Sequence, residues 1–258
     1  MADAAIRVER RGRVVRCTLE RPPLNLFEPG LIAALRATFV ELAADRTVGV
    51  AVLTGSGRAF TAGMNVNILR DLDTRDAEAM ITSLHDAIDA VHRAPFPVIA
   101  AINGAALGAG FELALACDLR VAATGAVLGL PEVRVGVPSV IQAALLPPLV
   151  GPGRAAELLL TGATIGAEQA LAWGLVNRVA ESAQLERAVQ ELVEPIVASG
   201  PDAIRLQKEL IIRWRETDLS AAVRAGIAAF VACYAGGEPR EGATAFLEKR
   251  PPRFGDSR

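Results

Sequence analysis

One carboxylate in this chain stands out because its sequence neighbours are apolar or small. Glu112 is the only charged residue in Ala94–Cys117. A buried carboxylate is costly unless it is paired, hydrogen-bonded or used in chemistry. Gly104, Gly108 and Gly110 precede it, and glycine lets a backbone turn sharply and approach a ligand closely. The residues that follow are typical of a buried helix, whose first N–H groups favour negative charge. The segment therefore predicts a site that stabilises an oxyanion.

A second glycine-rich loop, Gly55–Asn65, also joins an apolar strand to a helical stretch. Asn65 is a residue type that caps helix N-termini. Either loop alone is equally consistent with a tight strand-to-helix turn. Two such loops that direct N–H groups at one point would form an oxyanion hole.

Glu132 follows Pro131 and, taken alone, is typical of an exposed turn. If Glu132 and Glu112 lay in one apolar pocket, Glu132 would be a candidate catalytic residue. The pKa values of two neighbouring carboxyls are pushed apart, so that one is protonated while the other is ionised. General acid–base chemistry on a single substrate requires that arrangement.

Several other kinds of site are excluded. Neither glycine loop has the spacing of a dinucleotide-binding fingerprint, and the sequence contains no Walker A motif and no Gly-x-Ser-x-Gly elbow. The two histidines, His85 and His92, lie seven residues apart on a predicted surface helix. We expect both to be structural or solvated, and we predict no metal site.

The elements that would position these residues alternate between strands and helices, which predicts an α/β fold. Strands are expected at Val14–Leu19, Gly49–Thr54, Pro97–Ile102, Leu119–Ala122 and Val127–Leu130. Helices are expected around Leu31–Leu42 and at Ala155–Leu160, Ala167–Trp173, Leu185–Val197, Ala203–Trp214 and Leu219–Tyr234. We divide the chain into a core of residues 1–190 and a helical region of residues 191–258.

Composition and charge limit the kinds of partner and the cellular location that we expect. The 258 residues are 52% hydrophobic and carry a formal net charge of −2, which argues against nucleic acid. Ala94–Cys117 is long enough to cross a bilayer, but its glycines, prolines and Glu112 argue against a membrane span. Three widely spaced cysteines and a first segment without a signal pattern predict a reducing, cytoplasmic location.

Taken together, these motifs resemble the crotonase (enoyl-CoA hydratase/isomerase) family. They occur in the family's order through most of the chain. This combination is specific for the family, but it does not specify which of the family's reactions the protein catalyses. They are Glu20-Arg-Pro22 with Asn25, Leu53–Asn65, Pro97–Asp118, Pro131-Glu132 with Gly136–Pro138, Leu160–Asn177 and Phe246–Arg250.

The resemblance implies a spiral core of ββα turns and C-terminal helices that form a homotrimer, or a homohexamer as a dimer of trimers. It implies an acyl-CoA thioester as substrate and no further cofactor. It assigns the oxyanion-hole N–H groups to Met64 and Ala109 and the acid–base pair to Glu112 and Glu132. It also implies three CoA-binding residues, Ala62, Phe246 and Lys249. Of these, Phe246 and Lys249 would reach the CoA of a neighbouring subunit.

The resemblance thus predicts hydration of a 2-enoyl-CoA. An enoyl-CoA isomerase, a thioester hydrolase and a non-catalytic acyl-CoA-binding homologue remain alternatives, because fold alone does not establish activity. The chain departs from the family pattern at Ala109 within the glycine triplet, at Asn65 in place of aspartate, and in the residues after Pro138, which are not glycine-rich. The last departure leaves the acyl group open.

Overall fold

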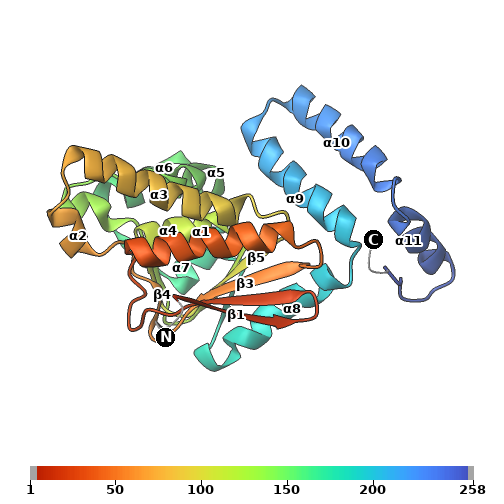
Figure 1. The fold of residues 1–258 in the computed structure, drawn as a ribbon, viewed down its shortest axis with the longest axis horizontal. Coiled ribbons are helices and arrows are strands. Elements are labelled where there is room, and N and C mark those ends of the chain that lie inside the picture. The colour runs from red at the N-terminus through yellow and green to blue at the C-terminus, as the bar shows by residue number, and fades with distance from the viewer. Residues whose placement is uncertain (1–4, 255–258) are drawn as a thin grey trace.

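The computed structural model describes residues 5–254, drawn as a ribbon in Figure 1. Its strands are β1 (Ile6–Arg11), β2 (Val14–Leu19), β3 (Val50–Gly55), β4 (Ala59–Thr61), β5 (Val98–Ile102), β6 (Ala105–Leu107), β7 (Leu119–Ala123), β8 (Val127–Gly129), β9 (Thr164–Gly166) and β10 (Arg178–Ala180). Six of them form a sheet in the order β1-β2-β3-β5-β7-β10. The other four form a smaller sheet in the order β4-β6-β8-β9. Only β1 with β2 and β8 with β9 pair antiparallel among these neighbours.

The α-helices of the described residues are α1 (Pro29–Ala44), α2 (Val66–Arg70), α3 (Thr74–His92), α4 (Ala109–Ala116), α5 (Leu146–Val150), α6 (Pro152–Thr161), α7 (Ala167–Ala172), α8 (Leu185–Val197), α9 (Pro201–Glu216), α10 (Leu219–Cys233) and α11 (Glu238–Leu247). Short 3-10 helices are η1 (Pro131–Val135), η2 (Gln142–Leu145) and η3 (Ser182–Gln184). The predicted strands and helices are therefore confirmed, with small shifts at their ends.

Successive strands of the chain alternate repeatedly between the two sheets: one pairs in the large sheet and the next pairs in the small sheet. β3 is followed by β4 and then by α2 and α3; β5 is followed by β6 and α4; β7 is followed by β8 and η1. This succession is the spiral of ββα turns that the resemblance implied. It brings the loops that follow β4, β6 and β8 to one edge of the small sheet, because these three strands are parallel.

Helices cover both faces of the large sheet, which explains why its inner strands are apolar throughout. α1 and α3 lie side by side on one face, and α8 lies on the other (Figure 1). Val189 and Val193 of α8 pack in one buried cluster with Ile99 and Val121 of the sheet. Residue 190, where we divided the chain, lies within α8, and the division itself stays a prediction.

α4 is buried along its whole length, so its polar ends need partners inside the protein. At its C-terminal end, the guanidinium of Arg120 donates to the carbonyl oxygens of Ala114 at 3.3 Å and Cys117 at 2.7 Å. A cation there is stabilised by the negative end of the helix dipole. The N-terminal end of α4 carries no such cation and is directed at a cavity described below.

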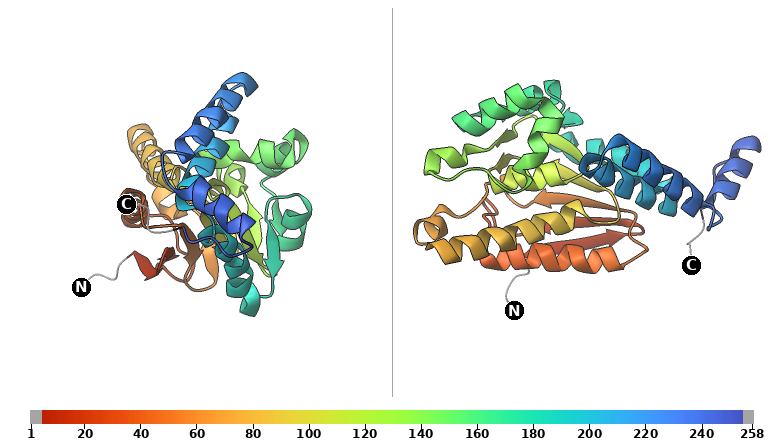
Figure 2. Two further views of the ribbon diagram at one scale, coloured as in Figure 1. Left: turned by 90° about the vertical axis from the view of Figure 1, so that its right-hand side faces the viewer. Right: turned by 90° about the horizontal axis from the view of Figure 1, so that it is seen from above.

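Helices α9, α10 and α11 project from the core, and we call residues 201–254 the C-terminal arm (Figure 2). Lys208 of α9 fastens the arm to the core, because its Nζ lies 2.5 Å from Oδ2 of Asp118. The same Asp118 oxygen accepts the N–H of Val98 at 2.8 Å. Lys208 is only 3% exposed, so this ion pair anchors α9 in a desolvated position.

Within residues 5–254 no single helix is long and apolar enough to cross a membrane. α10 and α11 reach that length and composition together, but they meet at a bend of 77°.

Candidate active site

The loop after β4 reaches the site through a glycine in the left-handed region. Gly63 has φ +86°, and a Cβ built on it would lie 2.6 Å from the carbonyl oxygen of Leu107 and 3.5 Å from the nitrogen of Ala109. The loop can therefore approach the loop after β6 only with glycine at this position. Asn65 then caps α2, as predicted, with its Oδ1 accepting the N–H of Asn67 at 3.0 Å.

The loop after β6 leads directly into α4. Gly108 turns the chain with φ +55°, and Ala109 is the first helical residue. The N–H of a first helical residue has no partner within its own helix. The helix begins at Ala109 and not at Leu113, the first of the apolar residues after Glu112 from which a helix was predicted. Ala109 lines a cavity, so the positive end of the helix dipole lies at the wall of that cavity.

Glu112 lies one turn into α4 and is 3% exposed. Its Oε1 accepts the N–H of Ala143 at 3.1 Å. Burial raises the pKa of Glu112 to about 7, the charge of Glu132 adds to that increase, and the backbone N–H groups of Val140, Ile141 and Ala143 oppose it. The carboxyl can therefore exchange a proton near neutral pH, as a general base must.

Glu132 lies in η1 and is half-buried against the start of α4. A Cβ built on Gly108 would come within 3.0 Å of its Oε1. Its Oε2 accepts the hydroxyl of Ser139 at 2.7 Å. The glutamate that looked like an exposed turn residue is therefore held beside the N-terminus of α4.

All four of the predicted oxyanion and acid–base residues line one cavity of about 450 Å³, which we call the core cavity. Ala62 lines it as well. The remaining wall is largely apolar and comes from α2, α3 and the segment after η1; its members include Leu69, Met80, Ile81, Leu84, Val137 and Val140. The structure thus brings five of the seven predicted site residues together, and their roles stay predictions.

The other two, Phe246 and Lys249, lie at the end of the C-terminal arm and do not line the core cavity. The Phe246 side chain is 82% exposed. Within one chain these two residues are therefore separate from the other five, which is compatible with the expectation that they serve a neighbouring subunit.

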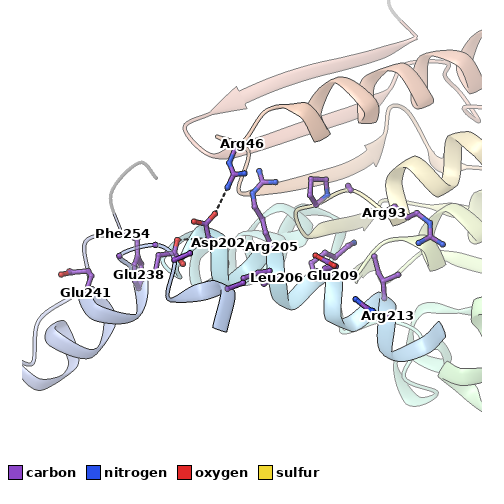
Figure 3. Close-up of a pocket in the computed structure, with 18 of the residues that line it drawn as sticks. Arg46, Arg93, Asp202, Arg205, Leu206, Glu209, Arg213, Glu238, Glu241 and Phe254 are labelled. Carbon is purple, nitrogen blue, oxygen red and sulfur yellow. Dashed lines mark hydrogen bonds and ion pairs between the residues drawn. The ribbon is translucent and has the colours of Figure 1, made fainter. Parts of the chain in front are cut away.

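A second cavity, which we call the arm cavity, lies between the arm and the core and has a volume of about 1240 Å³ (Figure 3). Charged side chains of both signs line it, including the ion pair of Arg46 with Asp202 at 3.1 Å. The wall holds acids such as Asp202 and Glu238 and bases such as Arg205 and Arg213, so the cavity as a whole does not carry charge of one sign.

The two histidines have structural partners. Nδ1 of His92 lies 3.2 Å from the carbonyl oxygen of Ala116, and Nδ1 of His85 lies 3.1 Å from Nε2 of Gln142. His92 is buried, whereas its helix was expected to lie on the surface. Among residues 5–254, no group of three or more His, Cys, Asp or Glu side chains could hold a metal ion.

Sequence reasoning missed Ser139 and the backbone of Ala143, which contact the two glutamates. The sequence showed only that the residues after Pro138 depart from the family's glycine-rich pattern. Ser139 lies seven positions after Glu132, beyond a left-handed turn at Gly136. No helical or strand periodicity brings such a pair together, so this contact had no signal in the sequence.

Known proteins share this arrangement of elements. A sequence model of the enoyl-CoA hydratase/isomerase family matches residues 9–257. The chain belongs to this family. It is 35% identical to the crotonyl-CoA hydratase of Syntrophomonas wolfei over 260 residues, which cover 98% of this chain and 99% of that protein. It is 33% identical to the short-chain-enoyl-CoA hydratase of Clostridium acetobutylicum over 246 residues, which cover 94% of each.

Among solved structures, the enoyl-CoA hydratase of Bacillus anthracis superposes with a TM-score of 0.93 at 35% identity. The match covers 97% of this chain and 98% of that one. Family and fold class, both predicted from the motifs, are thereby confirmed. The likeness extends through the C-terminal arm as well as the core, because almost the whole chain is covered.

Proposed function

We propose that this protein is an enoyl-CoA hydratase, which adds water across the 2,3-double bond of an enoyl-CoA thioester to give a 3-hydroxyacyl-CoA. One observation carries the proposal: Glu112 and Glu132 line the same cavity as the loops of Met64 and Ala109. The hydratase names of the relatives support it.

The two loops would stabilise the reaction's developing charge. Addition of water to an enoyl thioester places negative charge on the thioester oxygen. In the proposed arrangement that oxygen accepts the N–H groups of Met64 and Ala109, and the start of α4 adds its dipole. A preorganised donor of this kind contributes about 3–4 kcal/mol to transition-state stabilisation.

The two glutamates would divide the proton transfers. Glu112 takes a proton from the water whose oxygen bonds to the β-carbon, and Glu132 gives a proton to the α-carbon. One O–H bond of water, the O–H bond of protonated Glu132 and the π bond between the α- and β-carbons break, while a C–O bond, a C–H bond and an O–H bond on Glu112 form. Return of the Glu112 proton to Glu132 through water restores the starting state. No electrons leave the substrate, so the reaction needs no redox partner, and CoA is part of the substrate. The raised pKa of Glu112, about 7, supports proton exchange at this carboxyl near neutral pH.

The contacts with CoA that the core cavity does not provide would come from a neighbouring chain. α10 exposes a row of large apolar side chains: Leu219, Val223, Ile227, Phe230, Val231 and Tyr234. Exposed apolar surface of this kind marks an interaction site. We propose that it packs in a homotrimer, alone or doubled into a hexamer, in which Phe246 and Lys249 reach the CoA of a neighbour. Ala62 would lie along the CoA path within its own chain.

The test is a spectroscopic hydration screen over short, medium and branched 2-enoyl-CoA esters. The proposal predicts loss of the conjugated thioester absorbance and formation of 3-hydroxyacyl-CoA without free thiol. Conversion of a 3-enoyl-CoA to the 2-enoyl isomer, with no hydration, would establish the isomerase instead. Release of free CoA thiol would establish the hydrolase, and binding of all esters without turnover would establish a non-catalytic homologue.

A further inference from the structure

A single short segment, residues 139–143, contacts both glutamates of the core cavity. The Ser139 hydroxyl donates to Oε2 of Glu132 at 2.7 Å, and the N–H of Ala143 donates to Oε1 of Glu112 at 3.1 Å. Ser139 itself lines the core cavity. The two contacts differ in kind, since a backbone N–H is supplied by any residue except proline, whereas the first depends on the side chain at position 139.

The Ser139 contact distinguishes the two oxygens of Glu132. Oε2 accepts the hydroxyl, while Oε1 lies beside Gly108, 3.0 Å from where a Cβ on that residue would be. The terminal torsion of a glutamate is broad and roughly two-fold, so a half-buried carboxyl without a partner samples many orientations. A hydrogen bond to one oxygen removes most of that freedom. It also leaves Oε1 as the oxygen that carries a transferable proton.

We propose that Ser139 is a positioning residue, which holds Glu132 with Oε1 directed at the α-carbon of the bound thioester. This inference rests on the proposed function, because it assigns the α-carbon proton to Glu132. Ser139 acts through Glu132 and takes no proton itself: the O–H bond that breaks is at Oε1, and the C–H bond forms on the substrate. Its effect therefore falls on turnover and not on binding of the CoA ester.

The chain offers a matched pair of substitutions, Ser139→Val and Ser139→Thr. Their side chains have the same shape and differ only in a hydroxyl, so any change in packing is common to both. Since misplacement of a catalytic group by about 1 Å costs on the order of 10²-fold in rate, Ser139→Val should lower kcat by about 10- to 100-fold. KM should stay within about threefold, and Ser139→Thr should retain kcat within about threefold of wild type.

Crystal structures of the two variants give a readout that does not depend on activity. Glu132 should keep its position in Ser139→Thr and turn away from Gly108 in Ser139→Val, with equal melting temperatures for both proteins. The inference is overturned if the two variants have the same kcat, or if Glu132 does not move in Ser139→Val. A wild-type protein that hydrates no enoyl-CoA refutes the proposed function instead, and the crystal structures then still decide whether Ser139 positions Glu132.

Discussion

The core cavity and the C-terminal arm differ in how much of their function one chain can complete. In the core cavity, both glutamates have hydrogen-bond partners and the two glycine loops are packed against each other. The arm has the opposite character, because apolar side chains of α10 are exposed and the arm cavity is lined by charges of both signs (Figure 3). The residues of the proposed chemistry therefore come from one chain, whereas the large apolar side chains of α10 are left exposed by the rest of the described residues.

The largest expected effect concerns the packing of α4 against β4, which positions the two loops of the core cavity. A Cβ at Gly110 would lie 2.2 Å from the carbonyl oxygen of Thr61, so Gly110→Val should separate α4 from β4. We expect kcat/KM to fall by more than about 10²-fold. Gly125→Val is the matched control, because nothing lies within 4 Å of a Cβ at that position. Equal activity of the two variants would show that close loop packing is not needed.

The second prediction concerns the connection between arm and core. Lys208→Met keeps an apolar stem but leaves Asp118 without its buried cation, which should lower the free energy of unfolding by about 3 kcal/mol. Arg46→Met removes the exposed partner of Asp202 and should cost less than about 1 kcal/mol. Urea unfolding of both variants measures the difference. A cost for Lys208→Met no larger than that for Arg46→Met would contradict the buried anchor.

A pH-dependent effect distinguishes the core cavity from the arm. Because the pKa of Glu112 is raised to about 7 by folding, the folded protein binds a proton that the unfolded chain has released above pH 4.5. Stability should therefore fall as pH rises from 4.5 to about 7, by roughly 3 kcal/mol, and be constant above. Glu112→Gln should remove this component in urea unfolding at pH 5 and pH 7.5. In the wild type kcat/KM should change with pH around 7 as Glu112 titrates, and a flat profile would argue against Glu112 as a proton-transfer group.

The smallest effect on a single chain is expected on the exposed face of α10. Phe230 is 65% exposed, so Phe230→Asp should change the free energy of unfolding of one chain by only about 0.5 kcal/mol. The molecular mass in solution should nevertheless fall from that of a trimer or hexamer to that of a monomer. Val40→Asp, on the exposed side of α1, should leave the mass unchanged. An unchanged mass in Phe230→Asp would remove α10 from the proposed interface.

The strands and helices of the core could be predicted from the sequence better than the hydrogen bonds of the candidate active site. Apolar runs such as Pro97–Ile102 mark strands covered on both faces, because burial leaves little choice of residue type. Glycines in the loops could be assigned a role, since close approach of two backbones excludes a Cβ at Gly63 and Gly110.

Contacts between loop segments could not be predicted in the same way, because such segments have no helical or strand periodicity in their sequence. The start of α4 at Ala109 depends on how Gly108 turns, and apolar residues alone placed it later. The hydroxyl of Ser139 meets Glu132 across a left-handed turn, and the N–H of Ala143 meets Glu112 across 31 residues. Only the folded chain brings these groups together. The proposed contact of Phe246 with CoA would need a second chain, which one sequence cannot position.

The proposed hydration depends on the two glutamates of the core cavity. Glu132→Gln tests it most directly, because the amide keeps the shape of the side chain and can still accept the hydroxyl of Ser139, but it has no acidic proton to give. With crotonyl-CoA as substrate, turnover should fall by about 10²- to 10⁴-fold while the dissociation constant of the thioester stays within a few-fold of wild type. Turnover equal to that of the wild type would contradict the account.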